Sequence, residues 1–224
     1  MKTVQFVIRS REGSGELKFA MKHVICAGFT GRDQASVQEH VKELARMGVK
    51  PPASIPAAYN VPDSLVTSED SITVDGKMTS GEVECVVLYE GNRAYVTVGS
   101  DHTDREMEKK DIPKSKEACP KILAAEVWPY EEVSDHWDRI ELKSTVTDEG
   151  RESIYQEGTL GDLMKPEDIL ARVGGKSEGL VLYCGTMPVR GGQLKFAGRF
   201  RMEMRDPVLN RAISHEYDIV LSPE

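Results

Sequence analysis

The sequence has few cysteines, no long apolar run and no excess of positive charge, and each absence excludes a class of protein. Four of 224 residues are cysteine, and no two of them form a C-x-x-C pair, which argues against a disulfide framework and against a cysteine-built zinc site. No apolar run has the length of a membrane-spanning helix, and the first residues lack a signal-peptide pattern. We therefore expect a reduced, cytoplasmic protein with no membrane partner.

The balance of charges excludes another class of partner. The formal net charge is −8 at pH 7, whereas nucleic acids and anionic membranes bind surfaces rich in Lys and Arg. We expect no nucleic-acid partner, although a local basic pocket could still bind a small acidic molecule. The length of 224 residues is sufficient for a buried core, and we interpret residues 1–224 as a single domain. Within it, residues 1–60 are expected to supply a hairpin, a strand and a helix.

Most of the chain has the residue pattern of β-strands. Two segments instead have an apolar helical face and a helix-starting residue, namely Asp33 before residues 34–45 and Pro166 before residues 167–173. A charged stretch at 101–116 is predicted to contain a short solvated helix. The predicted strands are 3–8, 16–19, 23–27, 82–89, 94–101, 137–144, 179–185, 194–204 and 215–221. This pattern predicts an α+β fold that is mainly β, with a few peripheral helices.

The predicted hairpin at residues 82–101 carries the most informative group of side chains. Its two apolar strands are separated by a Gly-Asn turn signal. Because side chains alternate between the faces of a strand, Glu82 and Glu84 share one face. If Tyr89 pairs with Ala94, Glu82 lies opposite Asp101 on the neighbouring strand. The sequence therefore predicts three carboxylates at the open end of one hairpin.

Three carboxylates this close repel one another unless a cation lies between them. Oxygen ligands are typical of Mg²⁺ or Mn²⁺ sites, and less so of zinc sites. Glu82, Glu84 and Asp101 are therefore candidate metal ligands. The alternative is that these side chains face solvent or pair with Lys and Arg.

Six segments, in order along the chain, resemble motifs of the fumarylacetoacetate hydrolase superfamily. They are V-I-C-A-G with T-G-R-D at 24–33, the proline-rich 51–59, G-E-V-E at 81–84, D-H-T-D-R at 101–105, K-S with C-P at 114–120, and G-T-M-P-V at 185–189. Within the superfamily, the chain resembles the DUF2848 branch in particular. The resemblance covers most of the sequence.

The resemblance implies a β-roll-like fold, a homodimer, and Mg²⁺ or Mn²⁺ held by Glu82, Glu84 and Asp101. It also implies a small acidic substrate, namely a 2-oxo acid or an acylpyruvate-like compound. The metal would stabilise an enolate while a C–C bond is hydrolysed or CO₂ leaves.

The resemblance also assigns roles to residues around the metal. Lys114 is expected near the developing negative charge, although Lys116 takes this role if the one-residue gap falls elsewhere. Thr186 is expected to hydrogen-bond the substrate carboxylate, and Arg105 to line and brace the substrate site.

The chain departs from the superfamily pattern at the first helix. Hydrolytic members carry a His and a Glu there to activate water, whereas this sequence has Gln34 and Val37. Gln34 remains a candidate substrate-binding residue, but it cannot accept a proton at neutral pH. His102 is the alternative catalytic base, and Glu39 or His40 could substitute only if the helix were shifted. The departure also leaves open a non-catalytic protein that binds an acidic metabolite or pairs with an active paralogue.

Overall fold

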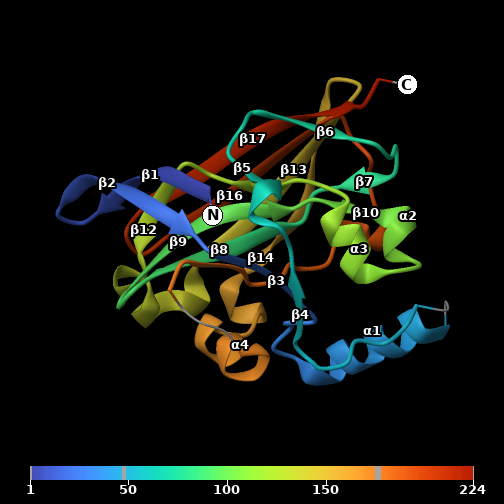
Figure 1. The fold of residues 1–224 in the computed structure, drawn as a ribbon, viewed down its shortest axis with the longest axis horizontal. Helices are drawn as coiled ribbons and strands as arrows, with labels where there is room; N and C mark the ends of the chain where they lie inside the picture. The colour runs from blue at the N-terminus through green and yellow to red at the C-terminus, as the bar shows by residue number, and fades with distance from the viewer. Residues whose placement is uncertain (1, 47–48, 175–177, 224) are drawn as a thin grey trace.

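The computed structural model describes residues 2–46, 49–174 and 178–223, and in it two β-sheets pack face to face (Figure 1). The larger sheet contains β1 (Lys2–Ser10), β2 (Gly13–Met21), β3 (His23–Gly28), β4 (Ala57–Asn60), β5 (Val66–Thr67), β8 (Val83–Glu90), β9 (Arg93–Asp101), β11 (Lys121–Leu123), β12 (Glu126–Pro129) and β15 (Leu180–Tyr183). The second sheet contains β6 (Ser71–Val74), β13 (Glu141–Asp148), β14 (Arg151–Thr159), β16 (Arg199–Asp206) and β17 (Arg211–Leu221). A small ladder joins β7 (Thr79–Ser80) to β10 (Thr103–Asp104).

The helices lie at the periphery of the sheets (Figure 1). They are α1 (Gln34–Arg46), α2 (Arg105–Glu108), α3 (Ile112–Glu117) and α4 (Pro166–Val173). Single 3₁₀ turns are η1 (Asp63–Leu65), η2 (Tyr130–Glu132), η3 (Ser134–Arg139), η4 (Leu160–Asp162) and η5 (Arg190–Gly192). In the part of the chain that the structure describes, no helix has the length and apolar character needed to cross a membrane. The fold is thus mainly β with few, peripheral helices, as the sequence predicted.

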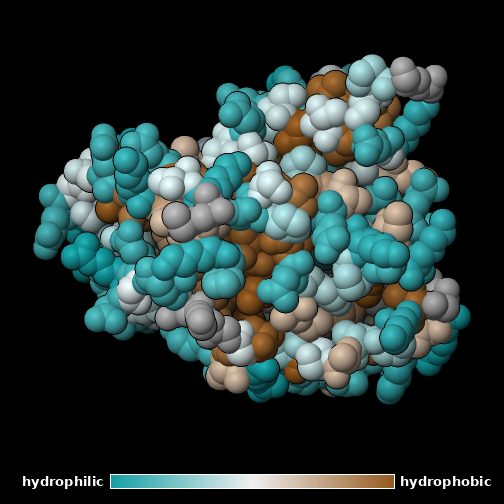
Figure 2. Space-filling view, viewed as in Figure 1, coloured by the Kyte–Doolittle hydropathy of each residue, from teal (hydrophilic) through white to brown (hydrophobic). Residues whose placement is uncertain are grey.

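The larger sheet buries apolar side chains on both of its faces. From β8, Cys85 and Val87 point toward the second sheet, and Val86 and Leu88 point into the other core. Strands buried on both faces read as continuous apolar runs, which explains why 85–88 shows no polar alternation. Most of the face drawn in Figure 2 is polar, with hydrophobic residues visible near its middle.

The β8–β9 hairpin has the predicted register. Tyr89 pairs with Ala94, and Glu84 pairs with Gly99. The amide of Asp101 donates to the carbonyl of Glu82 at 3.1 Å, which places these two residues opposite each other just beyond the paired strand.

Two sequence predictions need correction, and one strand was not predicted. The stretch 101–116 is not one solvated helix, because β10, α2 and α3 fold back onto the sheet and bury Arg105 and Lys116. The strand predicted at 137–144 begins only at Glu141. Trp137 lies instead in η3, which places its indole in the core. The sequence analysis missed β14, whose polar and apolar residues do not alternate: its two buried residues, Tyr155 and Gln156, are adjacent.

Candidate metal centre

The three predicted carboxylates converge where β8 begins and β9 ends. Glu82, Glu84 and Asp101 each offer one oxygen, and these oxygens lie within 4.8 Å of one another. Glu84 and Asp101 are buried, and the side chain of Glu82 is 13% exposed. The convergence follows from strand alternation and register, since all three project from the same face of one hairpin.

Each carboxylate has one oxygen held by a neighbouring group. The three contacts are Arg105 Nη1 to Glu82 Oε1 at 3.0 Å, the amide of Gly185 to Glu84 Oε2 at 2.7 Å, and Lys121 Nζ to Asp101 Oδ1 at 2.8 Å. A carboxylate fixed through one oxygen can direct the other toward a common point. Such outer contacts orient ligands in metal sites.

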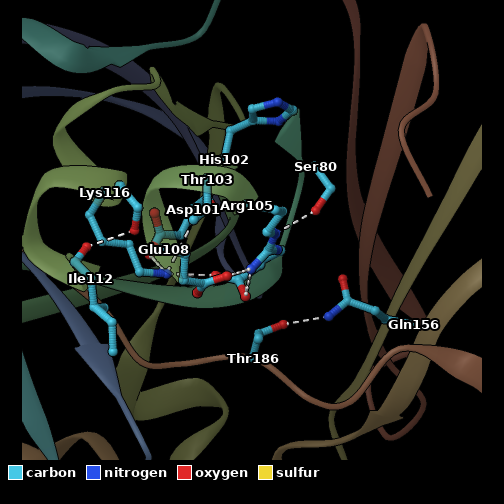
Figure 3. A network of polar contacts seen from close by, with 12 residues as sticks. Ser80, Asp101, His102, Thr103, Arg105, Glu108, Ile112, Lys116, Gln156 and Thr186 are labelled. Carbon is cyan, nitrogen blue, oxygen red and sulfur yellow. Dashed lines mark hydrogen bonds and ion pairs between the residues drawn. The ribbon is translucent and has the colours of Figure 1, made fainter. Parts of the chain in front are cut away.

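Lys116 contacts two of the three carboxylates. Its Nζ is 2.7 Å from Glu82 Oε2 and 2.8 Å from Asp101 Oδ2. It also donates to the hydroxyl of Thr103 at 3.3 Å, and its side chain is 9% exposed. Figure 3 shows the amine reaching from α3 into the carboxylate cluster.

Lys114, the lysine expected beside the substrate, lies elsewhere. Its side chain is 70% exposed and pairs with Asp111 at 3.6 Å. Residues two apart on an α-helix point in nearly opposite directions, so only one of Lys114 and Lys116 can face the carboxylates. The placement therefore favours the alternative, Lys116, because the N-cap at Asp111 fixes the phase of α3.

Arg105 is buried and braces the site. Besides Glu82, its guanidinium contacts Ser80 Oγ at 2.7 Å and Glu108 Oε2 at 2.9 Å. Asp104 caps α2 by accepting hydrogen bonds from the amides of residues 106 and 107, which fixes the helix that carries Arg105.

The His102 ring points away from the carboxylates, as Figure 3 shows. It contacts the hydroxyls of Tyr217 and Thr79, each at 3.0 Å, in the space between the sheets. Successive residues of an extended chain face opposite sides, so the ring of His102 and the carboxylate of Asp101 diverge. Burial, followed by the charge of Lys121, lowers the pKa of His102 to about 3, so the ring is neutral at pH 7.

Thr186 lies beside the cluster in the loop after β15. Its hydroxyl donates to the carbonyl of Val83 at 2.8 Å and accepts from Gln156 Nε2 at 2.7 Å. Gln156 also accepts from the amide of Val83 at 3.0 Å and donates to the carbonyl of Met187 at 2.7 Å. This buried amide therefore ties the start of β8 to the loop whose Gly185 amide holds Glu84.

The first helix does not bring its predicted residues to the carboxylates. Gln34 is exposed, and its amide donates to the carbonyl of Gly31 at 2.8 Å. Glu39 is exposed and pairs with Lys42 and Arg46 at 3.6 and 3.5 Å. The side chain of His40 lies outside the described part of the structure.

The electrostatics of the cluster differ among the three acids. Burial, with the charges of Asp101 and Glu82, raises the pKa of Glu84 well above its usual value. Burial alone would also raise the pKa of Glu82 and Asp101, but neighbouring cations outweigh it and lower both. The neighbouring cations therefore favour the ionised forms of Glu82 and Asp101, whereas burial favours the neutral form of Glu84.

Two residues of this site were not predicted from the sequence. Lys121 is fully buried on β11, directly across from Asp101, and also donates to the carbonyl of His102 at 2.6 Å. The sequence did contain a signal for Lys121, because this lysine begins the short apolar run K-I-L. A lysine that is buried with such a run needs a buried partner for its charge. Gln156, in a strand of mixed polarity, gave no such signal.

The donor set fits a hard dication. Among the described residues, the donor group consists of three carboxylate oxygens, which are typical ligands of Mg²⁺ or Mn²⁺. Each ligand is already oriented by an outer contact, so a cation would meet a preformed set of donors.

Comparison with solved structures finds the same fold in several proteins. "Crystal structures of Cg1458" superposes with a TM-score of 0.64 at 11% identity, covering 99% of this chain and 100% of that one. 2-Keto-3-deoxy-D-arabinonate dehydratase, complexed with magnesium and 2,5-dioxopentanoate, gives 0.62 at 16% identity over 90% and 74%. 4-Oxalocrotonate decarboxylase from Pseudomonas putida G7, complexed with calcium and acetate, gives 0.53 at 15% identity over 88% and 76%. These matches confirm the fumarylacetoacetate hydrolase-like fold.

Sequence comparison identifies the family. No curated protein gives a significant match. One family model, described as "Protein of unknown function (DUF2848)", matches residues 27–217, which include every residue of the carboxylate cluster and its basic partners. The chain therefore belongs to the DUF2848 family.

Proposed function

We propose that this protein is a metal-dependent enzyme acting on a small 2-oxo acid or acylpyruvate-like compound. One observation carries the proposal, namely the convergence of Glu82, Glu84 and Asp101 within 4.8 Å, each with one oxygen already held. Buried acids in this arrangement, with perturbed pKa values, are typical of functional sites.

The fold relatives support the class of substrate. The dehydratase is named for a 2-keto acid and was solved with magnesium and 2,5-dioxopentanoate, and the decarboxylase acts on an oxo dicarboxylate and was solved with calcium and acetate. Both are named for acidic oxo compounds, and both were solved with a divalent ion.

The proposed roles follow from the positions of the side chains. Glu82, Glu84 and Asp101 would hold Mg²⁺ or Mn²⁺, which supplies Lewis-acid polarisation of a bound oxo acid. Lys116 is the basic group best placed to contact an anionic substrate, because Arg105 and Lys121 are committed to other partners. As an ammonium group, Lys116 would also stabilise the negative charge that develops on the substrate.

The position of potential bases favours some reactions over others. His102 faces the opposite side of the strand, and Gln34 bonds its own loop. Hydrolysis of a C–C bond needs a group that activates water. Decarboxylation needs no activated water, so we favour it over hydrolysis.

A non-catalytic binder of an acidic metabolite is the second candidate. Three buried bases, Arg105, Lys116 and Lys121, already pair with Glu82 and Asp101 without any ion, and burial raises the pKa of Glu84, which favours its neutral form. Such a protein would bind a keto acid and release no product. It could also be the inactive partner of a paralogue.

Metal binding and turnover together test the proposal. We expect calorimetry to detect one Mn²⁺ per chain, and Glu84→Gln to weaken binding at least tenfold, since it removes one charged ligand of three. Glu90→Gln, at the other end of the same strand, is the matched control and should bind as the wild type does. A panel including oxaloacetate and acylpyruvates, followed by product analysis, should show turnover that oxalate inhibits. If Mn²⁺ binds and keto acids raise the melting temperature but no product forms, the protein is a non-catalytic binder of an acidic metabolite.

The quaternary state needs a separate measurement. We propose a homodimer from the family resemblance, and sedimentation velocity at micromolar concentration tests it.

A further inference from the structure

We infer that the ammonium group of Lys116 is a resident counter-ion, which the divalent cation replaces when it binds. The inference rests on the proposed metal site and adds an exchange step to it. Two observations support the inference. The amine of Lys116 contacts two of the carboxylates, and it makes few other contacts.

Lys116 contacts the second oxygen of two of the candidate metal ligands. Arg105 and Lys121 approach Glu82 and Asp101 at Oε1 and Oδ1, from outside the cluster. Lys116 instead contacts Oε2 and Oδ2, the second oxygen of each acid, at 2.7 and 2.8 Å. A dication held by Glu82 and Asp101 would compete with the ammonium group of Lys116 for these two acids, because two cations at ion-pair distance repel each other.

Lys116 is also the basic group most able to leave. Arg105 is anchored by Ser80 and Glu108, and Lys121 by the carbonyl of His102 at 2.6 Å. Beyond the carboxylates, the amine of Lys116 makes one weaker hydrogen bond, to the hydroxyl of Thr103 at 3.3 Å. A lysine amine on four flexible carbons can swing away while its backbone stays in α3.

The exchange has a functional consequence. Before an ion binds, Lys116 neutralises acids that would otherwise repel one another. After exchange, the displaced ammonium remains tethered beside the metal and can pair with an anion bound there. Metal binding would thereby prepare the second cationic contact for an acidic ligand.

Metal affinity in lysine variants tests the exchange directly. Lys116→Met keeps the length of the side chain but removes the competing cation, so we expect it to bind Mn²⁺ at least about tenfold more tightly than the wild type, the factor expected when one charged hydrogen bond no longer has to be broken. Lys116→Arg keeps the charge and should show no such gain. Lys114→Met, on the exposed side of the same helix, is the matched control and should bind as the wild type does. Calorimetry at pH 7.5 gives all four affinities, and thermal melts in EDTA and in Mn²⁺ check folding.

The outcomes separate this inference from the proposed function. If neither the wild type nor Lys116→Met binds Mn²⁺, the metal site itself is wrong. If both bind, but Lys116→Met binds equally or more weakly, the metal site stands and the exchange is refuted. A crystal structure with Mn²⁺ gives a second readout, because exchange requires the amine to lie beyond ion-pair distance, about 4 Å, from Glu82 or Asp101. An amine that still contacts both acids beside a bound ion would also refute it.

Discussion

The substitution Lys121→Met probes the buried charges at the base of the carboxylate cluster. Lys121 is fully buried, and its amine contacts Asp101 Oδ1 at 2.8 Å and the carbonyl of His102 at 2.6 Å. Methionine has a similar length and suits the apolar surroundings. The substitution therefore removes the charge and the hydrogen bonds while leaving little empty space.

The expected loss of stability follows from what remains after the substitution. Removing one partner of a buried ion pair costs about 3–5 kcal/mol, because the other charge is left buried. Asp101 keeps Lys116 at 2.8 Å, which limits the loss, while the carbonyl of His102 loses its side-chain donor. We expect the free energy of unfolding to fall by about 3 kcal/mol at pH 7.

The same substitution should change the response to acid. Burial alone would raise the pKa of Asp101, but Lys116 and Lys121 lower it well below its usual value. A lowered pKa stabilises the folded state above the unfolded pKa of about 3.9, and this contribution is lost as the pH falls through the folded value. Without Lys121 the pKa rises toward normal, so the difference between variant and wild type should shrink between about pH 5 and pH 3.

Urea unfolding in EDTA at a series of pH values measures both effects. The control is Lys143→Met, an exposed lysine on β13, which should change stability by no more than about 0.5 kcal/mol. A loss below about 1 kcal/mol for Lys121→Met, or a loss that does not vary with pH, would refute the reasoning that Lys121 holds Asp101 ionised.

Three further predictions concern residues around the cluster. Burial lowers the pKa of His102 to about 3, so the unfolded state binds more protons than the folded state below about pH 6.5. Stability should therefore fall by up to about 1.4 kcal/mol per pH unit between about pH 6.5 and pH 3, and His102→Gln should flatten this slope in urea titrations. Gly185 has φ +92°, and an added Cβ would lie 1.9 Å from Thr30 Oγ1, so Gly185→Ala should cost about 3 kcal/mol or more in the same assay; an unchanged midpoint would contradict this. Gln156→Leu should cost about 2–4 kcal/mol by leaving the buried amide of Val83 and the carbonyl of Met187 without partners, and should weaken Mn²⁺ binding in calorimetry; unchanged metal affinity would show that Gln156 does not position the ligands.

The sequence was sufficient to predict the hairpin and its three acids because both depend on local rules. Alternation puts Glu82 and Glu84 on one face, and the turn fixes which residue faces Asp101. The choice between Lys114 and Lys116 depends on which side of α3 faces the sheet. A helix of six residues is too short for its sequence pattern to predict that orientation.

Other parts of the site depend on contacts between distant segments. Lys121 reaches Asp101 because β11 adds to the edge of β9, and a three-residue strand carries too little pattern to predict its register. Gln156 acts on β8 from the second sheet, across 73 residues of sequence. Such partners follow from sheet packing, which periodicity alone does not specify.

The balance of charge in the cluster explains how this site can exist before an ion binds. Three acids buried without cations would repel one another or take up protons, and either effect would destabilise the hairpin that carries them. Arg105 and Lys121 contact Glu82 Oε1 and Asp101 Oδ1, and both have further anchoring partners. Lys116 contacts the second oxygen of each acid, and its other hydrogen bond is to the hydroxyl of Thr103. If the fold depended on a metal ion to neutralise these acids, it would need no amine between Glu82 and Asp101. With the exchange inferred above, the protein folds with the site closed by Lys116 and opens that position to a dication afterwards.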